Sequence, residues 1–400
     1  MKTIIQIASI IMLIILTGCN DDFMERYPKT SIAPEIFFNT EEDLQMYIYG
    51  LYNFGGFGTS TDDAYNTTDD AVTTGVSEIK TIMTSGASTS RTILTGWTWG
   101  QLRSINFFLA NFQKANLTQS KMDHYEGLAR FFRARFYYDK VLRYNDVPWI
   151  DFVMETNSDE LYVGQDPRTY VVDKIMEDLE FAAIHVEASG GKGAVNKWVV
   201  KTFYARIALT EGSYRRYHSE LNLSETAEKY FEIAVNQSKE IMDQGGFSIY
   251  NTGKPESDYR TLFTSSDLTA NTEVIMPVIF DYNIRSNGVG AGVFGDYETC
   301  PTRNLVQTYL MKDGSFYSSQ AGWETKQYVE EFQDRDPRIY QTLTYPGWEL
   351  IYTETYAQGA GIHLPRLGKN FTGYHQIKGF INIVDVEERR GIDWPLIRYA

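Results

Sequence analysis

Two tryptophans at the end of a long polar loop are the side chains best suited to binding a ligand. Trp97 and Trp99 are flanked by Gly96 and Gly100. An indole face packs well on the apolar face of a sugar ring, and the indole N–H can donate to a hydroxyl. The alternative is a role in the core. We favour that alternative for Trp99, as the buried anchor at the start of a helix, and both roles stay open for Trp97.

Charged and phenolic side chains in the loops could complete a surface for hydroxylated ligands. The loop Asn53–Trp97 is rich in Gly, Ser, Thr and Asp. It exceeds the ~15 residues above which loops of compact domains are usually functional or disordered. Its charged groups would form hydrogen bonds with hydroxyls, although such side chains are often simply solvated. The predicted ligand-binding residues are Trp97, Arg91, Asp69, Asp70, Trp99 and Tyr297.

Motifs for catalysis or a cofactor lack the context that they need. Gly290–Gly295 satisfies GxGxxG, but the following residues, 296–301, cannot open the helix that a dinucleotide site requires. No pair of histidines has the spacing of zinc ligands on a helix, and no GxSxG elbow occurs. A glycosidase-type pair can always be nominated among 52 acidic residues, so we predict no catalytic residues and keep a surface glycoside hydrolase as the rival hypothesis.

Four aspartates in the early loop raise the question of a metal. Asp62, Asp63, Asp69 and Asp70 could supply the oxygen ligands that calcium prefers. Their spacing is not that of an EF-hand loop, and aspartate in turns mostly bonds to the local backbone. We therefore predict no cofactor and no metal site, with calcium as the open alternative.

The overall composition describes an acidic globular protein. The chain has 400 residues, 43% of them hydrophobic, which is enough for a large core or two subdomains. The formal net charge of -15 would repel a phosphate backbone, so nucleic-acid binding is not expected. The 28 tyrosines exceed ordinary usage and suit surfaces that stack on a ligand while donating hydrogen bonds.

The N-terminal residues predict export and a lipid anchor. An apolar run from Ile4 to Leu16 is too short to span a membrane and fits a signal peptide over residues 1–18. Leu16-Thr17-Gly18-Cys19 resembles the lipobox of bacterial lipoproteins, in which the cysteine is acylated with palmitate-type chains. Lipidation of Cys19 would leave Cys300 as a buried thiol. Residues 19–39 are then a tether, and the acidic pair after Cys19 resembles a signal for surface export.

Helical periodicity dominates residues 40–246, which we expect to form one helical domain that includes the long loop, residues 53–98. Its organising element is Tyr125–Trp149, whose two apolar stripes imply a helix packed between neighbours on both sides. Short connections between the helices predict stacked antiparallel hairpins in a tetratricopeptide-like superhelix, with a loose repeat. The other predicted helices are Thr40–Leu51 with a capping box, Trp99–Phe112, Thr169–Val186, Lys197–Glu211 capped by Asn196 and stopped by Gly212, and Ser224–Gln244 stopped by Gly245 and Gly246.

In residues 247–392 the helical periodicity gives way to patterns of short strands and turns, which predict a loop-rich, minor-β subdomain that binds the ligand. Glu273–Phe280 is a short β run, and Pro277 confines it to a sheet edge or a bulge. Trp394–Ala400 is interpreted as the opening of another helix, with Pro395 in its first turn. On that interpretation residues 393–400 begin a further helix and the chain is C-terminally incomplete.

These motifs together resemble the SusD/RagB family of outer-membrane nutrient-binding lipoproteins. The most specific one is Tyr125–Ala134 running to Asp146-Val147-Pro148. Asn145 stands where the family usually has glycine, and asparagine is the next best residue for a left-handed turn. Further matches follow in the expected order: Asp178-Leu179, Ala182-Ala183, Ala205–Leu209, Glu273–Ile275, Pro301-Thr302, Asp313-Gly314, Arg335–Arg338, Gly373-Tyr374, Lys378 and Arg398–Ala400.

The resemblance implies a non-catalytic protein of the outer membrane. Such a protein would be lipid-anchored, would face the cell exterior, and would form a lid on a SusC-like TonB-dependent transporter. It would bind oligosaccharides and pass them to the transporter, with a peptide ligand as the alternative within the family. Binding residues vary between members, so the ligand residues named above rest on position and chemistry.

Overall fold

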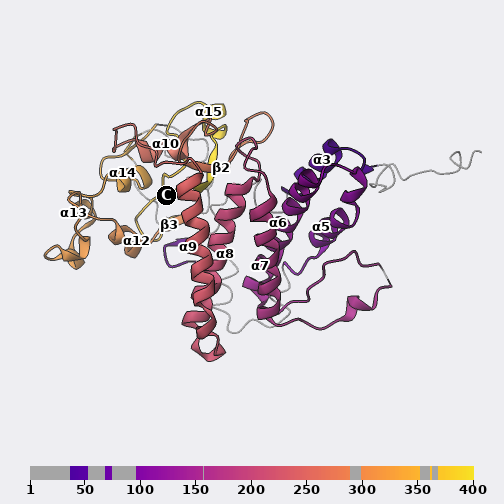
Figure 1. Ribbon diagram of the computed structural model, residues 1–400. Coiled ribbons are helices and arrows are strands. Elements are labelled where there is room, and N and C mark those ends of the chain that lie inside the picture. The colour runs from indigo at the N-terminus through magenta and orange to yellow at the C-terminus, as the bar shows by residue number, and fades with distance from the viewer. Residues whose placement is uncertain are drawn as a thin grey trace, which may run out of the picture.

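The computed structural model describes residues 37–52, 68–73, 96–155, 157–288, 299–351, 361–362 and 368–400. The fold is mainly helical and has two parts, a row of long helices and a loop-rich part that contains the last residues of the chain (Figure 1). The predicted signal peptide, Cys19 and most of the predicted tether lie outside the described ranges. Within these ranges no helix has both the length and the apolar character that crossing a bilayer requires.

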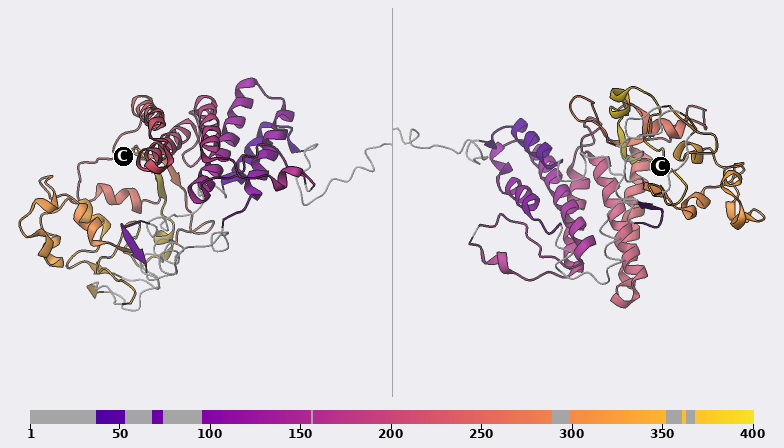
Figure 2. Two further views of the ribbon diagram at one scale, coloured as in Figure 1. Left: turned by 90° about the horizontal axis from the view of Figure 1, so that it is seen from below. Right: turned by 180° about the vertical axis from the view of Figure 1, so that it is seen from behind.

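The helical part stacks its helices in the order of the chain. Each long helix packs against the next, and the row is seen end-on in the left view of Figure 2. The predicted architecture of stacked hairpins is confirmed. The helices are α3 (Glu41–Leu51), α5 (Gly100–Asn111), α6 (Gln119–Tyr144), α7 (Arg168–His185), α8 (Lys197–Tyr217) and α9 (Glu228–Gln244), with 3-10 turns η4 (Phe112–Ala115), η5 (Asp159–Tyr162), η6 (Ser219–Leu221) and η7 (Ser224–Thr226).

Two predicted helix starts are confirmed by their caps. The Thr40 hydroxyl accepts from the Asp43 backbone N–H at 3.2 Å, and the Asp43 carboxylate accepts from the Thr40 N–H at 2.9 Å. The Asn196 side chain accepts from the first backbone N–H groups of α8, at 3.0 and 3.2 Å. Each cap satisfies donors that would otherwise lack a partner.

The organising helix α6 lies between neighbours, as its two stripes predict. Its first stripe, Tyr125, Leu128, Phe132 and Phe136, is buried throughout. In the second stripe, which consists of Phe131, Ala134, Tyr138, Val141 and Leu142, Tyr138 is half-buried and Leu142, in the last turn, is exposed. Two basic residues of α6 pair with acids: the Arg133 guanidinium donates to both Asp178 oxygens, at 2.7 and 2.8 Å, and Arg130 pairs with Glu126.

The end of α6 is built around Asn145, as predicted. Its φ of +66° is positive, as the prediction of a left-handed turn requires, but its ψ of -80° lies outside the left-handed helical region. Its N–H donates to the Val141 carbonyl at 3.0 Å. The next residue, Asp146, accepts from the backbone N–H of Arg168, the first residue of α7, at 2.8 Å. The residues that stop α6 therefore also position the start of α7.

Gly212 does not end α8, which continues to Tyr217. A Cβ at Gly212 would lie 2.8 Å from the Phe231 ring of α9, so the glycine permits close packing of the two helices. The prediction that it stops the helix was wrong because packing, which periodicity does not report, explains this glycine. The end of α9 before Gly245 and Gly246 is as predicted, with Gly246 at a φ of +71°.

The loop-rich part contains short elements around two small cores. The strands in the described ranges pair antiparallel, β1 with β3, β2 with β6 and β4 with β5. Its elements are β1 (Ala71–Thr73), α10 (Asp258–Thr264), β2 (Val274–Val278), β3 (Thr299–Pro301), α12 (Arg303–Thr308), η8 (Tyr317–Ser319), η9 (Trp323–Thr325), α13 (Tyr328–Glu331), α14 (Arg338–Thr342), β4 (Glu349–Leu350), β5 (Gly361–Ile362), α15 (Val386–Arg390) and β6 (Trp394–Arg398).

The predicted helix at Trp394–Ala400 is wrong, because residues 394–398 form strand β6. This strand pairs antiparallel with β2, and the backbone N–H of Tyr399 donates to the Glu273 carbonyl at 2.8 Å. A helix here would leave the buried backbone groups of β2 without these partners. The prediction for β2 itself is confirmed: Pro277 lies in a two-stranded sheet beside a shift in register.

We expect that Asp178→Ala lowers the free energy of unfolding by about 3–5 kcal/mol, since it leaves the buried Arg133 cation without its carboxylate. Urea unfolding of the purified chain measures this change. The matched control is Glu177→Ala on the exposed face of α7, which should change stability by less than about 0.5 kcal/mol. Equal losses in the two variants would contradict a structural role for the buried pair.

Candidate functional site

Trp97 and Trp99 form an aromatic corner where α5 begins and α6 ends. The Trp97 ring lies edge-on to Tyr144 at 4.7 Å and to Trp99 at 5.0 Å, and Trp99 directly precedes the first residue of α5. Lys140 of α6 donates to the Gly96 carbonyl and holds the incoming loop. Both indoles are half-buried against the helical core, which supports the anchor role for Trp99. Ligand contact by Trp97 stays a prediction.

Asp69 and Asp70 lie elsewhere, on a ledge formed by β1 and β3. The Asp69 carbonyl accepts from the Thr302 hydroxyl and the Asp70 carbonyl from the Thr302 N–H, both at 2.8 Å. Thr302 in turn caps α12, so this ledge leads directly into that helix. Tyr297 and Arg91 lie outside the described residues. Trp97 is not part of this ledge.

The calcium alternative remains a prediction. Asp62 and Asp63 lie outside the described ranges, as does the GxGxxG segment, residues 290–295. In the part of the chain that the structure describes, no three His, Cys, Asp or Glu side chains gather as metal ligands. Cys300 is buried in β3, as expected, and its thiol contacts the Lys369 carbonyl at 3.8 Å.

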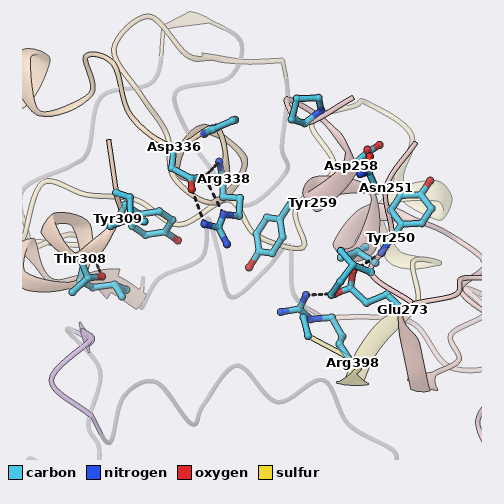
Figure 3. A pocket seen from close by; sticks show the side chains of 17 residues that line it. Tyr250, Asn251, Asp258, Tyr259, Glu273, Thr308, Tyr309, Asp336, Arg338 and Arg398 are labelled. Atoms are coloured by element: carbon cyan, nitrogen blue, oxygen red, sulfur yellow. Dashed lines mark hydrogen bonds and ion pairs between the residues drawn. The ribbon is translucent and has the colours of Figure 1, made fainter. Parts of the chain in front are cut away.

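A large cavity among the described residues lies in the loop-rich part, at the far end of α12 from the ledge. Its volume is about 720 Å³, and its walls come from the segment before α10, from α10 itself, from α12 and from the residues that lead into α14 (Figure 3). Arg398 of β6 and Ala400 complete the wall. The polar and aromatic lining residues are Tyr250, Asn251, Asp258, Tyr259, Glu273, Thr308, Tyr309, Asp336, Arg338 and Arg398.

An exposed ion pair stands at the entrance to α14. The Arg338 guanidinium donates to the two Asp336 oxygens at 2.9 and 2.6 Å, and the Arg338 backbone N–H donates to the same carboxylate at 2.9 Å. These hydrogen bonds from Arg338 lower the pKa of Asp336, while the bond from Arg338 to Asp336 raises the pKa of the guanidinium. Figure 3 shows Arg338 between Asp336 and the Tyr259 ring. The pair is therefore preorganised and charged at neutral pH.

A second ion pair lies deeper. Glu273 is 2% exposed, accepts from Arg398 at 2.7 Å and from the Tyr250 backbone N–H at 2.8 Å. The Arg398 guanidinium also lies over the Tyr259 ring, 5.6 Å from its centroid. One Glu273 oxygen is bonded to Arg398 and the other to the Tyr250 backbone. The pair therefore joins the start of β2, the end of β6 and the segment before α10 within the wall of the cavity.

The third carboxylate, Asp258, is fixed by local hydrogen bonds. It accepts from the Thr252 hydroxyl at 2.6 Å and from the backbone N–H groups of Thr252 and Lys254 at 2.7 and 3.1 Å. The bond from the Thr252 hydroxyl is the main cause that lowers the pKa of Asp258. A general acid needs a raised pKa, so neither Asp258 nor Asp336 is tuned for glycosidic protonation.

A smaller pocket of about 430 Å³ adjoins the aromatic corner. It lies between α5 and residues 150–161, and its walls are mostly apolar, with Arg103, Asn106 and Glu155 as polar members. The Asn106 amide donates to the carbonyls of Ile150 and Phe152, both at 3.0 Å. Those bonds tie the loop after α6 to α5. The smaller pocket therefore offers few hydrogen-bonding groups to a hydroxylated ligand, and the larger cavity is the better candidate site.

Sequence reasoning missed the larger cavity. Its lining residues come from separate segments, among them 249–259, 305–310, 336–338 and 398, and no local motif links them. The motif Arg335–Arg338 and Arg398 match the family pattern, and nothing in their local sequence assigns them a role in binding. Only the antiparallel pairing of β2 with β6, which brings Arg398 to Glu273, would have indicated the site.

Comparison with known proteins agrees with this architecture. A family model described as the SusD family matches residues 251–400. "SusD-like protein P2" of Formosa agariphila is 24% identical over 301 residues, which are 71% of this chain and 54% of that protein. The chain thus spans about half the length of this relative.

Solved structures match the fold over most of the chain. A SusD-like protein of Bacteroides fragilis superposes with a TM-score of 0.71 at 20% identity, covering 94% of this chain and 75% of that one. A "SusD-like carbohydrate binding protein" of the same species has a TM-score of 0.68 at 19% identity, over 91% and 72% of the two chains. This chain is SusD-like in fold and in the sequence of its C-terminal part, and the resemblance drawn from the sequence is confirmed.

We expect Trp97→Ala to lower the free energy of unfolding by about 1–3 kcal/mol, because it removes the ring that packs on Tyr144 and Trp99. Trp97→Phe keeps an aromatic ring in place and should lose less than half as much. Urea unfolding followed by circular dichroism measures both changes. Unchanged stability in Trp97→Ala would exclude a structural role for this ring.

Proposed function

We propose that this protein is a non-catalytic lipoprotein of the outer membrane that binds oligosaccharides and passes them to a SusC-like TonB-dependent transporter. The observation that carries the proposal is the cavity of about 720 Å³, lined by three tyrosines, two arginine–carboxylate ion pairs and the hydrogen-bonded Asp258, in a SusD-like fold. The names of two similar structures support the ligand class. One is the carbohydrate-binding protein of Bacteroides fragilis, and the other is a "Laminarin binding SusD-like protein" with a TM-score of 0.56 at 15% identity, covering 90% of this chain and 78% of that one.

The lining of the cavity fits the chemistry of a sugar. A pyranose ring has apolar C–H faces and a rim of hydroxyls, so it needs flat aromatic walls and fixed donors and acceptors. Tyr259 and Tyr309 provide rings, and Figure 3 shows both hydroxyls near the centre of the site. The guanidinium of Arg338 keeps N–H groups beyond the two that Asp336 accepts. Because these groups are held by their neighbours, little side-chain entropy is lost on binding.

Binding without hydrolysis fits the state of the carboxylates. A glycoside hydrolase needs one carboxyl group with a raised pKa and a second one free to act as base or nucleophile. The pKa values of Asp258 and Asp336 are lowered, and Glu273 accepts hydrogen bonds on both oxygens. The carboxylates of the cavity are thus committed to holding the site together, which favours a binding protein over the surface glycoside hydrolase.

The lipid anchor and the transporter are the finer parts of the proposal. The lipobox at Leu16–Cys19 supports attachment to the membrane, and the acidic pair after it supports exposure on the cell surface. A protein held at the surface by a lipid anchor gains a high effective concentration near a partner in the same membrane. Transfer of a captured glycan to a transporter needs no chemistry from this chain.

Affinity electrophoresis in gels that contain laminarin, dextrin or xylan tests the ligand class. We expect at least one of these glycans to retard the purified chain and none to release reducing ends on incubation with it. Tyr259→Ala should weaken the retention about tenfold, equivalent to one stacking contact of about 1.4 kcal/mol. The control Tyr217→Ala removes an 82% exposed ring at the end of α8, away from the cavity, and should bind like the parent protein. Release of reducing ends would establish the hydrolase instead.

Cys19→Ala tests the anchor. Since the thioether-linked lipid would be lost, we expect the variant in the soluble fraction after cell lysis, whereas the parent protein sediments with membranes. Cys300→Ala is the matched control, because it also removes a thiol but leaves the predicted lipidation site intact. Persistent sedimentation of Cys19→Ala with membranes would contradict lipid anchoring at this residue.

A further inference from the structure

Among the residues that the structure describes, each guanidinium that lines the cavity is already paired with a carboxylate. The lining contains two guanidinium groups, Arg338 and Arg398, and three carboxylates, Asp258, Glu273 and Asp336. Each guanidinium is bonded to one of the carboxylates, and Asp258 remains as an excess negative charge. We infer that the cavity selects uncharged oligosaccharides over chains that carry carboxylate or sulfate groups, and that Asp336 sets this preference by neutralising Arg338. The inference rests on the proposed function.

Arg338 is the cation that an acidic sugar would otherwise use. Its side chain is 55% exposed, whereas that of Asp336 is 15% exposed, so the guanidinium faces the ligand and the carboxylate lies behind it. A bidentate pair occupies the edge of the guanidinium that best matches a carboxylate or sulfate. The remaining N–H groups can donate to hydroxyls singly. A ligand anion at that position would be attracted by Arg338 and repelled by Asp336 at nearly the same distance.

Arg398 cannot take over that role. Its partner Glu273 is buried and also accepts the Tyr250 N–H, so the pair cannot open without leaving a buried charge alone. The guanidinium is held over the Tyr259 and Phe263 rings, 5.6 and 5.3 Å from their centroids. Lys378 also lies over these rings, but it is not among the residues that line the cavity.

The surroundings act in the same direction. Asp258 lies in the wall and is charged at neutral pH, because its oxygens accept three hydrogen bonds. The whole chain carries a formal net charge of -15, which repels polyanions before they reach the site. Uncharged oligosaccharides experience neither the repulsion by Asp258 nor that by the net charge, and they can use every donor and acceptor of the lining.

The test compares neutral glycans with their own oxidised forms. The probes are laminarin and dextrin, each before and after oxidation of the primary hydroxyls to carboxylates, in affinity electrophoresis at low salt. The matched variants are Asp336→Asn, which keeps the shape of the side chain, and Asp334→Asn, which removes the same charge from an exposed residue that does not line the cavity. Asp334 has a φ of +54°, a conformation that asparagine also tolerates.

We expect the parent protein to bind a neutral chain more tightly than its oxidised form. Asp336→Asn should raise affinity for the oxidised form by about fivefold, the effect of one partly exposed charge pair, and this gain should fade at high salt. Asp334→Asn should show no such gain, and adding Arg338→Gln to Asp336→Asn should abolish it. Thermal unfolding verifies that each variant is folded.

Three outcomes would count against these ideas in different ways. Equal or tighter binding of the oxidised chain by the parent protein would overturn the selection of uncharged ligands. Equal effects of Asp336→Asn and Asp334→Asn would overturn the role of Asp336. Failure of the parent protein to bind any of the four probes, when it also binds no xylan, would overturn the proposed function and this inference with it.

Discussion

Buried ion pairs between neighbouring helices are the constraint on which the helical part depends. Arg133 of α6 bonds Asp178 of α7, and Glu211 of α8 accepts from both Arg168 of α7 and Arg215 of its own helix. A buried charge without its partner is strongly destabilising, so the pairs Arg133–Asp178 and Arg168–Glu211 each hold two helices in one register. Apolar stripes alone would allow neighbouring helices to slide by a turn. The ion pairs therefore specify the alignment of a row whose cohesion comes from apolar packing.

The strand pair β2–β6 carries this alignment into the loop-rich part. Ile275, Met276 and Ile397 belong to the core of the helical part, whereas Val274, Val278 and Trp394 belong to the next core. One short antiparallel pair thus contributes side chains to both cores. The Glu273–Arg398 bond connects the residue before β2 to the end of β6 and forms one wall of the cavity. The geometry of the candidate site consequently depends on packing in both parts.

The sequence predicts a structural feature well when the interactions that determine the feature are made between residues close together in the chain. Caps at Thr40 and Asn196 and the positive φ at Asn145 follow from side chains acting on their own backbone, and all three are as predicted. Gly212 and residues 394–398 were misinterpreted, because the packing of α9 and the pairing with β2 determine them. The cavity could not be predicted at all, since its charges meet only after several distant segments have folded together. Of the predicted ligand residues, the structure joins Asp69 and Asp70 on one ledge and separates them from the aromatic corner of Trp97 and Trp99.

The two kinds of ion pair in this molecule differ in what a substitution would cost. Breaking a buried pair between helices costs about 3–5 kcal/mol, a large part of the stability of a typical domain. An exposed pair between residues two apart in the chain, such as Asp336 and Arg338, contributes about 0–1 kcal/mol. Charges at the candidate site can therefore change with little effect on the helical part. A fold of this kind can keep one architecture while the charges that its cavity presents to a ligand are altered, because specificity and stability rest on different residues.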